Sequence, residues 1–207
     1  MAFSFAKMWG CSMNLIFITG PGAVGKMAVG KELSERLGYG FMHNHIAIEP
    51  VLEVCGKFDS SVVLDIRKSL FYGYLKNNLD SKGFVVTLMV PYDVPFSFVY
   101  LDNLVELAEG ILGDKKVKAY YVELFASLET RLQRNRTPLR LELKKSKRDL
   151  EESDSILLRE EKDRLTSYVG EVEKYFPNYL RIENDSLSVD EQVAMIINKF
   201  GFSIISS

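Results

Sequence analysis

The chain has 207 residues, of which 47% are hydrophobic and 12% aromatic. This length and composition can bury the core of one domain, which excludes intrinsic disorder as the main state. The 26 Lys and Arg residues are balanced by 28 Asp and Glu residues, giving a formal net charge of -2, so the sequence lacks the excess of basic residues typical of a general nucleic-acid binder.

The cysteines and the first residues bear on the compartment. Cys11 and Cys55 have neither a CxxC partner nor metal-ligand spacing, which excludes a disulfide framework and favours a reducing cytoplasmic setting. No apolar run is long enough to cross a bilayer, so no membrane partner is expected. Residues 1–13 carry one positive charge, Lys7, and no true apolar core of a signal. We expect an N-terminal extension there, and one domain over residues 14–207, as a monomer or homodimer.

Short apolar segments alternate with longer amphipathic ones along the chain. In chain order the sequence predicts strand 14–19, helix 26–37, strand 39–45, helix 60–81, strand 84–90, helix 98–109, strand 116–124, helix 128–135, strand 179–183 and a final helix. Residues 136–164, dense in charges of both signs, predict a mobile lid followed by an exposed helix to about residue 175. Ser188 and Glu191 form a capping box for the final helix. The alternation predicts a parallel sheet covered on both faces, with ligands at the carboxyl ends of its strands.

A phosphate-binding motif follows the first predicted strand. Residues 20–26 match G-x-x-x-x-G-K between a strand and a helix, the loop whose backbone N–H groups cradle phosphates. The predicted nucleotide contacts are Gly20, Pro21, Gly22, Ala23, Val24, Gly25, Lys26 and Met27. Lys26 is predicted to reach the β- and γ-phosphates and to act in catalysis. Met27 replaces the usual Ser or Thr, and a thioether is a poor ligand for Mg²⁺. The Mg²⁺ ligand set is therefore expected to be incomplete.

With this loop and the arginine-rich segment 131–140, the sequence resembles the P-loop small-molecule kinases, which include shikimate kinase, gluconate kinase, chloramphenicol phosphotransferase and nucleoside monophosphate kinases. The loop, a His-Asn-His tip and that segment also resemble a group of uncharacterised bacterial kinase-like proteins. The resemblance implies a three-layer α/β P-loop NTPase fold, with a five-stranded parallel sheet in the order 2-3-1-4-5. It implies an acceptor-binding region at about residues 43–80 and a helical lid at about 134–155. It also implies ATP with Mg²⁺ as the phosphate donor and a small molecule as the acceptor.

Arginines near the predicted lid are candidates for the nucleotide side of the site. The resemblance implies that Arg134 and Arg136 clamp the transferring phosphate and that Arg131 contributes to nucleotide binding. The alternative for these arginines is a solvated helix face with ion pairs. The resemblance also places Asn184 beside the adenine, although a turn before a helix explains this residue equally well.

Polar residues after the second and third strands are candidates for the acceptor side. His43, Asn44 and His45 stand where shikimate kinase-like proteins have an Asp-x-Asp pair. Imidazole can act as a base near neutral pH, and structural hydrogen bonding is the alternative. Without those carboxylates, the pocket is expected to tolerate an anionic acceptor. Arg67 corresponds to an acceptor-contacting arginine or is a surface residue. Asp93 is a candidate base or metal-water ligand, or the cap of a loop.

The sequence thus predicts an ATP-dependent kinase that phosphorylates a hydroxyl of a small molecule. The alternative is a nucleotide-binding switch or sensor with weak or no catalysis, which Met27 and the missing carboxylates favour. A kinase acting on nucleic-acid ends is disfavoured by the near-neutral charge. ATP consumption that depends on an acceptor distinguishes the kinase from the sensor.

Overall fold

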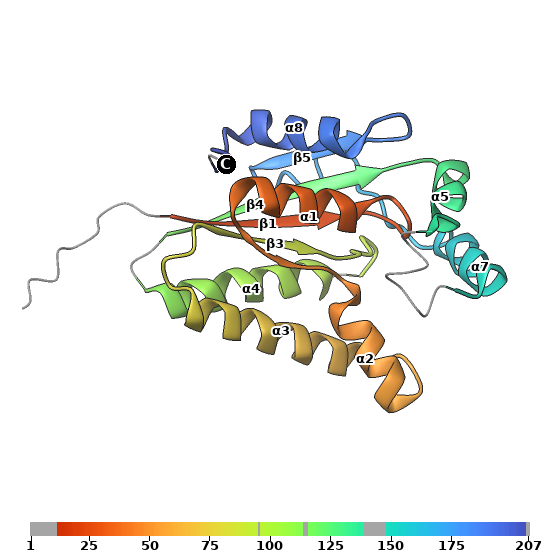
Figure 1. The fold of residues 1–207 in the computed structure, drawn as a ribbon, viewed down its shortest axis with the longest axis horizontal. Coiled ribbons are helices and arrows are strands. Elements are labelled where there is room, and N and C mark those ends of the chain that lie inside the picture. The colour runs from red at the N-terminus through yellow and green to blue at the C-terminus, as the bar shows by residue number, and fades with distance from the viewer. Residues whose placement is uncertain (1–11, 95, 114–115, 139–147, 206–207) are drawn as a thin grey trace, which may run out of the picture.

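The computed structural model describes residues 12–94, 96–113, 116–138 and 148–205, in which a five-stranded parallel sheet lies between two layers of helices (Figure 1). The sheet order is β2-β3-β1-β4-β5, which confirms the expected order. The strands are β1 (Met13–Thr19), β2 (Gly40–Met42), β3 (Gly83–Thr87), β4 (Val117–Phe125) and β5 (Tyr179–Glu183). The helices are α1 (Lys26–Leu37), α2 (His45–Cys55), α3 (Ser60–Asn77), α4 (Phe96–Leu112), α5 (Leu128–Asn135), α7 (Leu150–Glu160) and α8 (Val189–Phe200).

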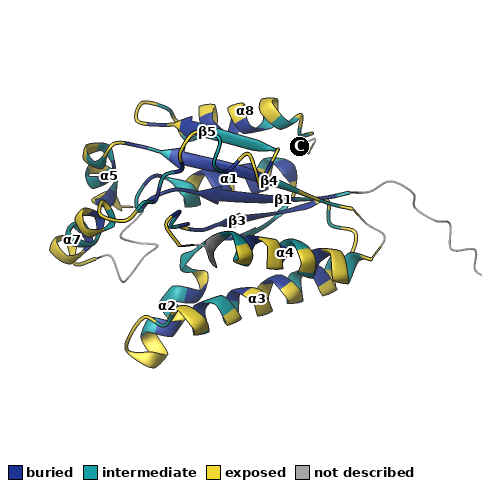
Figure 2. Ribbon diagram, turned by 180° about the vertical axis from the view of Figure 1, so that it is seen from behind, coloured by how far each residue is buried: buried dark blue, intermediate teal, exposed yellow. Residues whose placement is uncertain are grey.

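The central strand β1 separates two cores. Leu15 and Phe17 face the core that α3 and α4 cover, whereas Ile16 and Ile18 face the core beneath α1 and α8. All four side chains are fully buried, as expected for a parallel strand covered on both faces. Figure 2 shows the same layering, with a buried sheet and helices exposed on their outer faces. The two cores fix β1 in register with β3 and β4, so the loop after β1 lies at the carboxyl edge of the sheet.

Most predicted elements are observed, although the predicted helix 60–81 ends at Asn77 and the predicted strand 84–90 ends at Thr87. The predicted helices 26–37 and 128–135 and the predicted strand 179–183 are confirmed as α1, α5 and β5. The predicted strand 39–45 is wrong beyond Met42, because His45 begins α2. Pro50 lies inside α2, and a proline in that position argues against a helix in any sequence-based reading. The extension 1–13 lies outside the described residues except for Ser12 and Met13, and Met13 is already part of β1.

The predicted exposed helix to residue 175 is also wrong. Helix α7 ends at Glu160, and the following residues form turns until β5 begins. Val172 and Phe176 are buried in the core beneath α4, so this segment packs inward where a charged exposed helix was predicted. Residues 139–147 of the predicted lid lie outside the described residues. No helix in the described parts of the chain combines the length and apolar character needed to cross a membrane.

A buried carboxylate fixes the connection between α7 and β5. Glu123 of β4 is fully buried. Its carboxylate accepts hydrogen bonds from the backbone N–H of Ser167 at 2.7 Å, from the Ser167 hydroxyl at 2.5 Å and from the Tyr179 hydroxyl at 2.5 Å. The connection is therefore tied to the sheet through one side chain.

We expect Glu123→Ala to destabilise the protein by about 3 kcal/mol, because it leaves buried donors without an acceptor. For a chain of this size the melting temperature should fall by roughly 6–12 °C. Tyr179→Phe removes a single donor and should cost about 1 kcal/mol. Urea denaturation of the three proteins tests this, and equal midpoints for Glu123→Ala and wild type would contradict it.

Candidate nucleotide and acceptor site

The loop between β1 and α1 has a backbone that requires glycine at two positions. Gly20 has φ +128°, and a Cβ there would lie 2.2 Å from the carbonyl oxygen of Leu124 in β4. Gly25, immediately before α1, has φ +107°. Ala23 between them also has a positive φ, of 58°, a conformation that is rare for a residue with a side chain and common at functional sites. The motif is thus folded as a tight loop against the sheet edge.

Lys26 and the start of α1 give this loop its positive character. The Nζ of Lys26 donates hydrogen bonds to the carbonyl oxygens of Gly20 at 2.6 Å and Pro21 at 2.7 Å, so the side chain folds back over the loop. Gly25 offers no side-chain cap to the first N–H groups of α1. Uncapped helical N–H groups beside an ammonium group form a favourable environment for phosphate.

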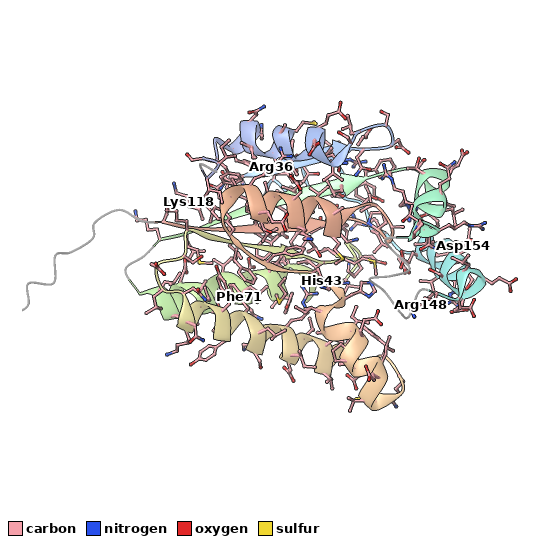
Figure 3. All side chains as sticks on the ribbon, in the orientation of Figure 1. Arg36, His43, Phe71, Lys118, Arg148 and Asp154 are labelled. Atoms are coloured by element: carbon pink, nitrogen blue, oxygen red, sulfur yellow. The ribbon has the colours of Figure 1, made fainter. Side chains whose placement is uncertain are left out.

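A cavity of about 760 Å³ opens on this loop. Residues 22–27 line it, whereas Gly20 and Pro21 of the predicted contacts do not. Its other walls come from the ends of β2 and β3 and from α1, α2, α5, α7 and the start of α8. Figure 3 shows His43 and Asp154 toward the carboxyl end of the sheet, with Lys118 toward the opposite end. The cavity therefore occupies the edge at which ligands bind in open parallel sheets.

An acidic side chain from α7 sits on the phosphate loop. The Oε2 of Glu160 accepts a hydrogen bond from the backbone N–H of Gly22 at 3.0 Å. A Cβ on Gly22 would lie only 2.4 Å from that oxygen, so the two groups are in close contact. Sequence reasoning missed Glu160, because no local pattern marks one acid among many in this charged segment. The contact shows that the loop can hold a carboxylate oxygen.

The described residues offer few oxygen ligands for Mg²⁺ beside the phosphate loop. Among them no group of three or more His, Cys, Asp or Glu side chains is placed to hold a metal ion. Met27 lines the cavity with a thioether in place of the usual hydroxyl. The Thr87 hydroxyl at the end of β3 already accepts a hydrogen bond from the Asn44 N–H at 3.0 Å.

Of the three arginines predicted for the nucleotide side, only Arg134 lines the cavity. Its guanidinium donates to the Asn184 side chain at 2.9 Å, to the Asn184 carbonyl at 2.7 Å and to the Val24 carbonyl at 3.3 Å. Asn184 is fully buried and donates to Val24 at 2.9 Å. These bonds join the phosphate loop to the loop after β5. Arg134 therefore lines the cavity while it is held by Asn184, which lies buried behind the cavity wall.

Arg131 and Arg136 lie elsewhere. Arg131 is buried, pairs with Glu161 and approaches the Gly22 carbonyl at 3.5 Å, so it supports the phosphate loop from behind. Arg136 is exposed and pairs with Asp154 of α7 at 2.5 Å. This second pair matches the alternative of an exposed ion pair that the sequence left open.

The loop after β5 is also held by Asp185. Its carboxylate accepts hydrogen bonds from the N–H and hydroxyl of Ser127 at 3.0 and 2.5 Å and from the Thr130 hydroxyl at 2.6 Å. These bonds lower the pKa of Asp185 to about 2. The carboxylate thus joins the loop after β5 to the start of α5.

We expect Asp185→Asn to lower stability at neutral pH, with a difference that shrinks in acid. Because the folded-state pKa lies below the ordinary value, the ionised carboxylate stabilises the fold above about pH 4. That contribution is lost as the pH falls toward 2. Urea midpoints of both proteins between pH 7 and pH 2.5 test this. A difference that is constant or grows toward low pH would contradict it.

The His-Asn-His tip lies at the cavity, and Arg67 lies behind it. His43, Asn44 and His45 all line the cavity, and His45 Nδ1 lies 3.2 Å from Glu49 Oε1. Arg67 is 2% exposed and does not line the cavity. It donates to the side-chain oxygen of Asn44 and, at 3.1 Å, to the carbonyl of Thr87. Burial lowers the pKa of Arg67 from its ordinary value.

Asp93 is not among the residues that line the cavity. It lies in the loop after β3 and is exposed. Its charge acts on Arg164, where it helps to raise the pKa of the guanidinium, after the larger effect of the Glu171 hydrogen bond.

Solved structures of small-molecule kinases share this fold. A candidate kinase from Chloroflexus aurantiacus has a TM-score of 0.56 and 16% identity, covering 92% of this chain and 97% of that one. A sugar kinase from Janibacter has a TM-score of 0.53 and 8% identity, covering 93% and 96%. A gluconokinase from Sinorhizobium meliloti has a TM-score of 0.51 and 15% identity, covering 92% and 93%. No family model and no curated protein sequence matches the chain. The fold is that of the P-loop small-molecule kinases, and at these identities the likeness shows the fold alone.

Proposed function

We propose that this chain is an ATP-dependent phosphotransferase that acts on a hydroxyl of a small molecule. The observation that carries the proposal is one cavity lined both by the phosphate loop with Lys26 and by the His43–His45 tip. A donor and an acceptor placed there would meet at the edge of the sheet. The shared fold with small-molecule kinases supports this reading, and the two cysteines without a disulfide pattern support a cytoplasmic setting.

The reaction would join the acceptor oxygen to the γ-phosphorus while the bond from that phosphorus to the β–γ bridging oxygen breaks. The products are the phosphorylated acceptor, ADP and a proton. Such transfer depends mainly on positioning and on stabilisation of negative charge. Lys26 and the loop N–H groups would supply that stabilisation. Mg²⁺ would enter with the nucleotide, held by phosphate oxygens and water.

The acceptor proton would pass to the imidazole of His43, which faces the cavity. His45, held by Glu49, would instead contact the acceptor. We expect His43→Gln to lower kcat by about 10²-fold and His45→Gln mainly to raise KM. Steady-state kinetics test the division, and equal effects on kcat from both variants would contradict it.

The first experiment is a thermal-shift titration with ATP, with and without Mg²⁺, followed by an assay of ATP consumption with and without candidate acceptors. Saturation at 100 times the Kd should stabilise the fold by roughly 2.7 kcal/mol. Stabilisation by ATP and acceptor-dependent consumption together would support the kinase. Tight ATP binding without turnover would favour the switch or sensor, a reading that Met27 and the Glu160 contact support. No stabilisation by any nucleotide would overturn both.

A further inference from the structure

The α2 side of the cavity is apolar. Ile48 and Leu52 lie one turn apart on α2, and Phe58 follows in the turn before α3. Met27 of α1 and Met89, just after β3, line the same cavity. Phe58 is 57% exposed and Met89 is 39% exposed. Large apolar side chains that stay open to solvent on a cavity wall are typical of a surface that an apolar ligand covers.

The fully charged side chains of the cavity come from elements other than α2. Among the described residues that line it, these side chains are Lys26, Lys31, Arg134 and Glu160. These residues belong to α1, α5 and the end of α7. No Asp, Glu, Lys or Arg of α2 lines the cavity. A carboxylate or phosphate on an acceptor that lies against α2 would therefore contact no Lys or Arg of this helix. The free-energy cost of removing that anion from water would then not be offset by an ion pair there.

The cation expected to recognise an anionic acceptor is turned away from the cavity. Arg67 is buried behind Asn44, and two of its nitrogens donate to Asn44 Oδ1 and to the Thr87 carbonyl. Its guanidinium group thus donates to oxygens at the ends of β2 and β3. Since Asn44 Oδ1 accepts from Arg67, the amide NH₂ is the polar group that Asn44 can offer to an acceptor oxygen. Arg67 is a positioning residue for this amide.

We propose that the acceptor is an uncharged alcohol with a bulky apolar body. The body would cover Ile48, Leu52, Phe58 and the two methionines, while its hydroxyl would lie between His43 and the phosphate loop. This assignment rests on the proposed phosphotransferase activity and names its substrate class. It replaces the anionic acceptor that the missing carboxylates had favoured.

A matched pair of probes tests the assignment, because 3-phenyl-1-propanol and 3-phenylpropanoate share one body and differ at the end group. Calorimetric titrations of the protein saturated with a non-hydrolysable ATP analogue should show binding of the alcohol at least tenfold tighter than that of the acid or of gluconate. Leu52→Asn should weaken the alcohol at least tenfold. Val54→Asn is the control, because Val54 lies on the same helix, is 83% exposed and does not line the cavity.

The outcomes separate this inference from the proposed function. Three results would overturn the apolar acceptor if the protein still binds ATP: preference for gluconate or the acid, no binding of the alcohol, or equal effects of the two asparagine variants. Each of these results would leave the proposed phosphotransferase activity standing. Leu52-dependent alcohol binding without any ATP binding would overturn the phosphotransferase, and with it the role of the alcohol as acceptor. Transfer of labelled γ-phosphate to the alcohol would support both.

Discussion

Replacing Lys26 by alanine should lower kcat/KM for ATP by on the order of 10³-fold, because its ammonium group lies on the loop expected to hold the phosphates. Removing one preorganised charge-stabilising donor in comparable sites costs about 10²–10³-fold in rate. The Lys26 ammonium group donates to the carbonyl oxygens of Gly20 and Pro21 and lies on the cavity wall, outside both hydrophobic cores. The fold should therefore tolerate the change, and stability should fall by about 1 kcal/mol or less.

Lys118→Ala is the control for this prediction. Lys118 is an exposed lysine of β4 toward the opposite end of the sheet (Figure 3), and its removal changes the net charge by the same amount. Its kcat/KM should equal that of the wild type. Turnover by Lys26→Ala at the wild-type rate would show that the loop does not act on phosphate. Circular dichroism of both variants separates loss of chemistry from loss of fold.

The sheet could be predicted because its information is local. The apolar runs that form β1 and β4 and the glycines around residue 20 are contiguous in sequence, and each run is buried by helices that the same alternation predicts. The strand order came from the resemblance to kinases and is confirmed. The local sequence pattern did not predict α2, because Pro50 lies inside that helix. It also gave a wrong prediction after residue 160, where the segment packs Phe176 into the core in spite of its charged composition.

The phosphate loop and the His-Asn-His tip could be placed at one edge of the sheet from short motifs, and residues of both line the candidate cavity. A sequence says less where a role depends on which way a long side chain turns. Arg67 and Arg134 could reach a ligand by length alone, yet each donates to carbonyl oxygens of the protein. Ile48 and Leu52 have helical spacing that would have indicated the apolar wall, had α2 been recognised. Glu160 depends on where a distant helix ends, which no local signal records.

Glu160→Gln should tighten ATP binding by about tenfold to a hundredfold. The carboxylate bonds to the N–H of Gly22, a group that ATP would use, so a phosphate must displace it or lie beside it. Two unit charges about 4 Å apart repel by about 4 kcal/mol at an effective dielectric constant of 20. Partial solvent exposure and movement of α7 reduce this to about 1–3 kcal/mol. Calorimetric Kd values for wild type and variant measure the effect.

Glu151→Gln is the matched control, because Glu151 is an exposed acid in the first turn of the same helix. It removes the same charge without touching the loop and should leave the Kd for ATP unchanged. Adenosine, which has no phosphate, should bind the wild type and Glu160→Gln equally, since repulsion requires a second negative charge. Weaker ATP binding by Glu160→Gln, confined to solutions with Mg²⁺, would instead identify this carboxylate as a metal ligand. On this proposal the Glu160 carboxylate competes with the phosphates of ATP for the Gly22 N–H, so the nucleotide binds only as tightly as that competition allows.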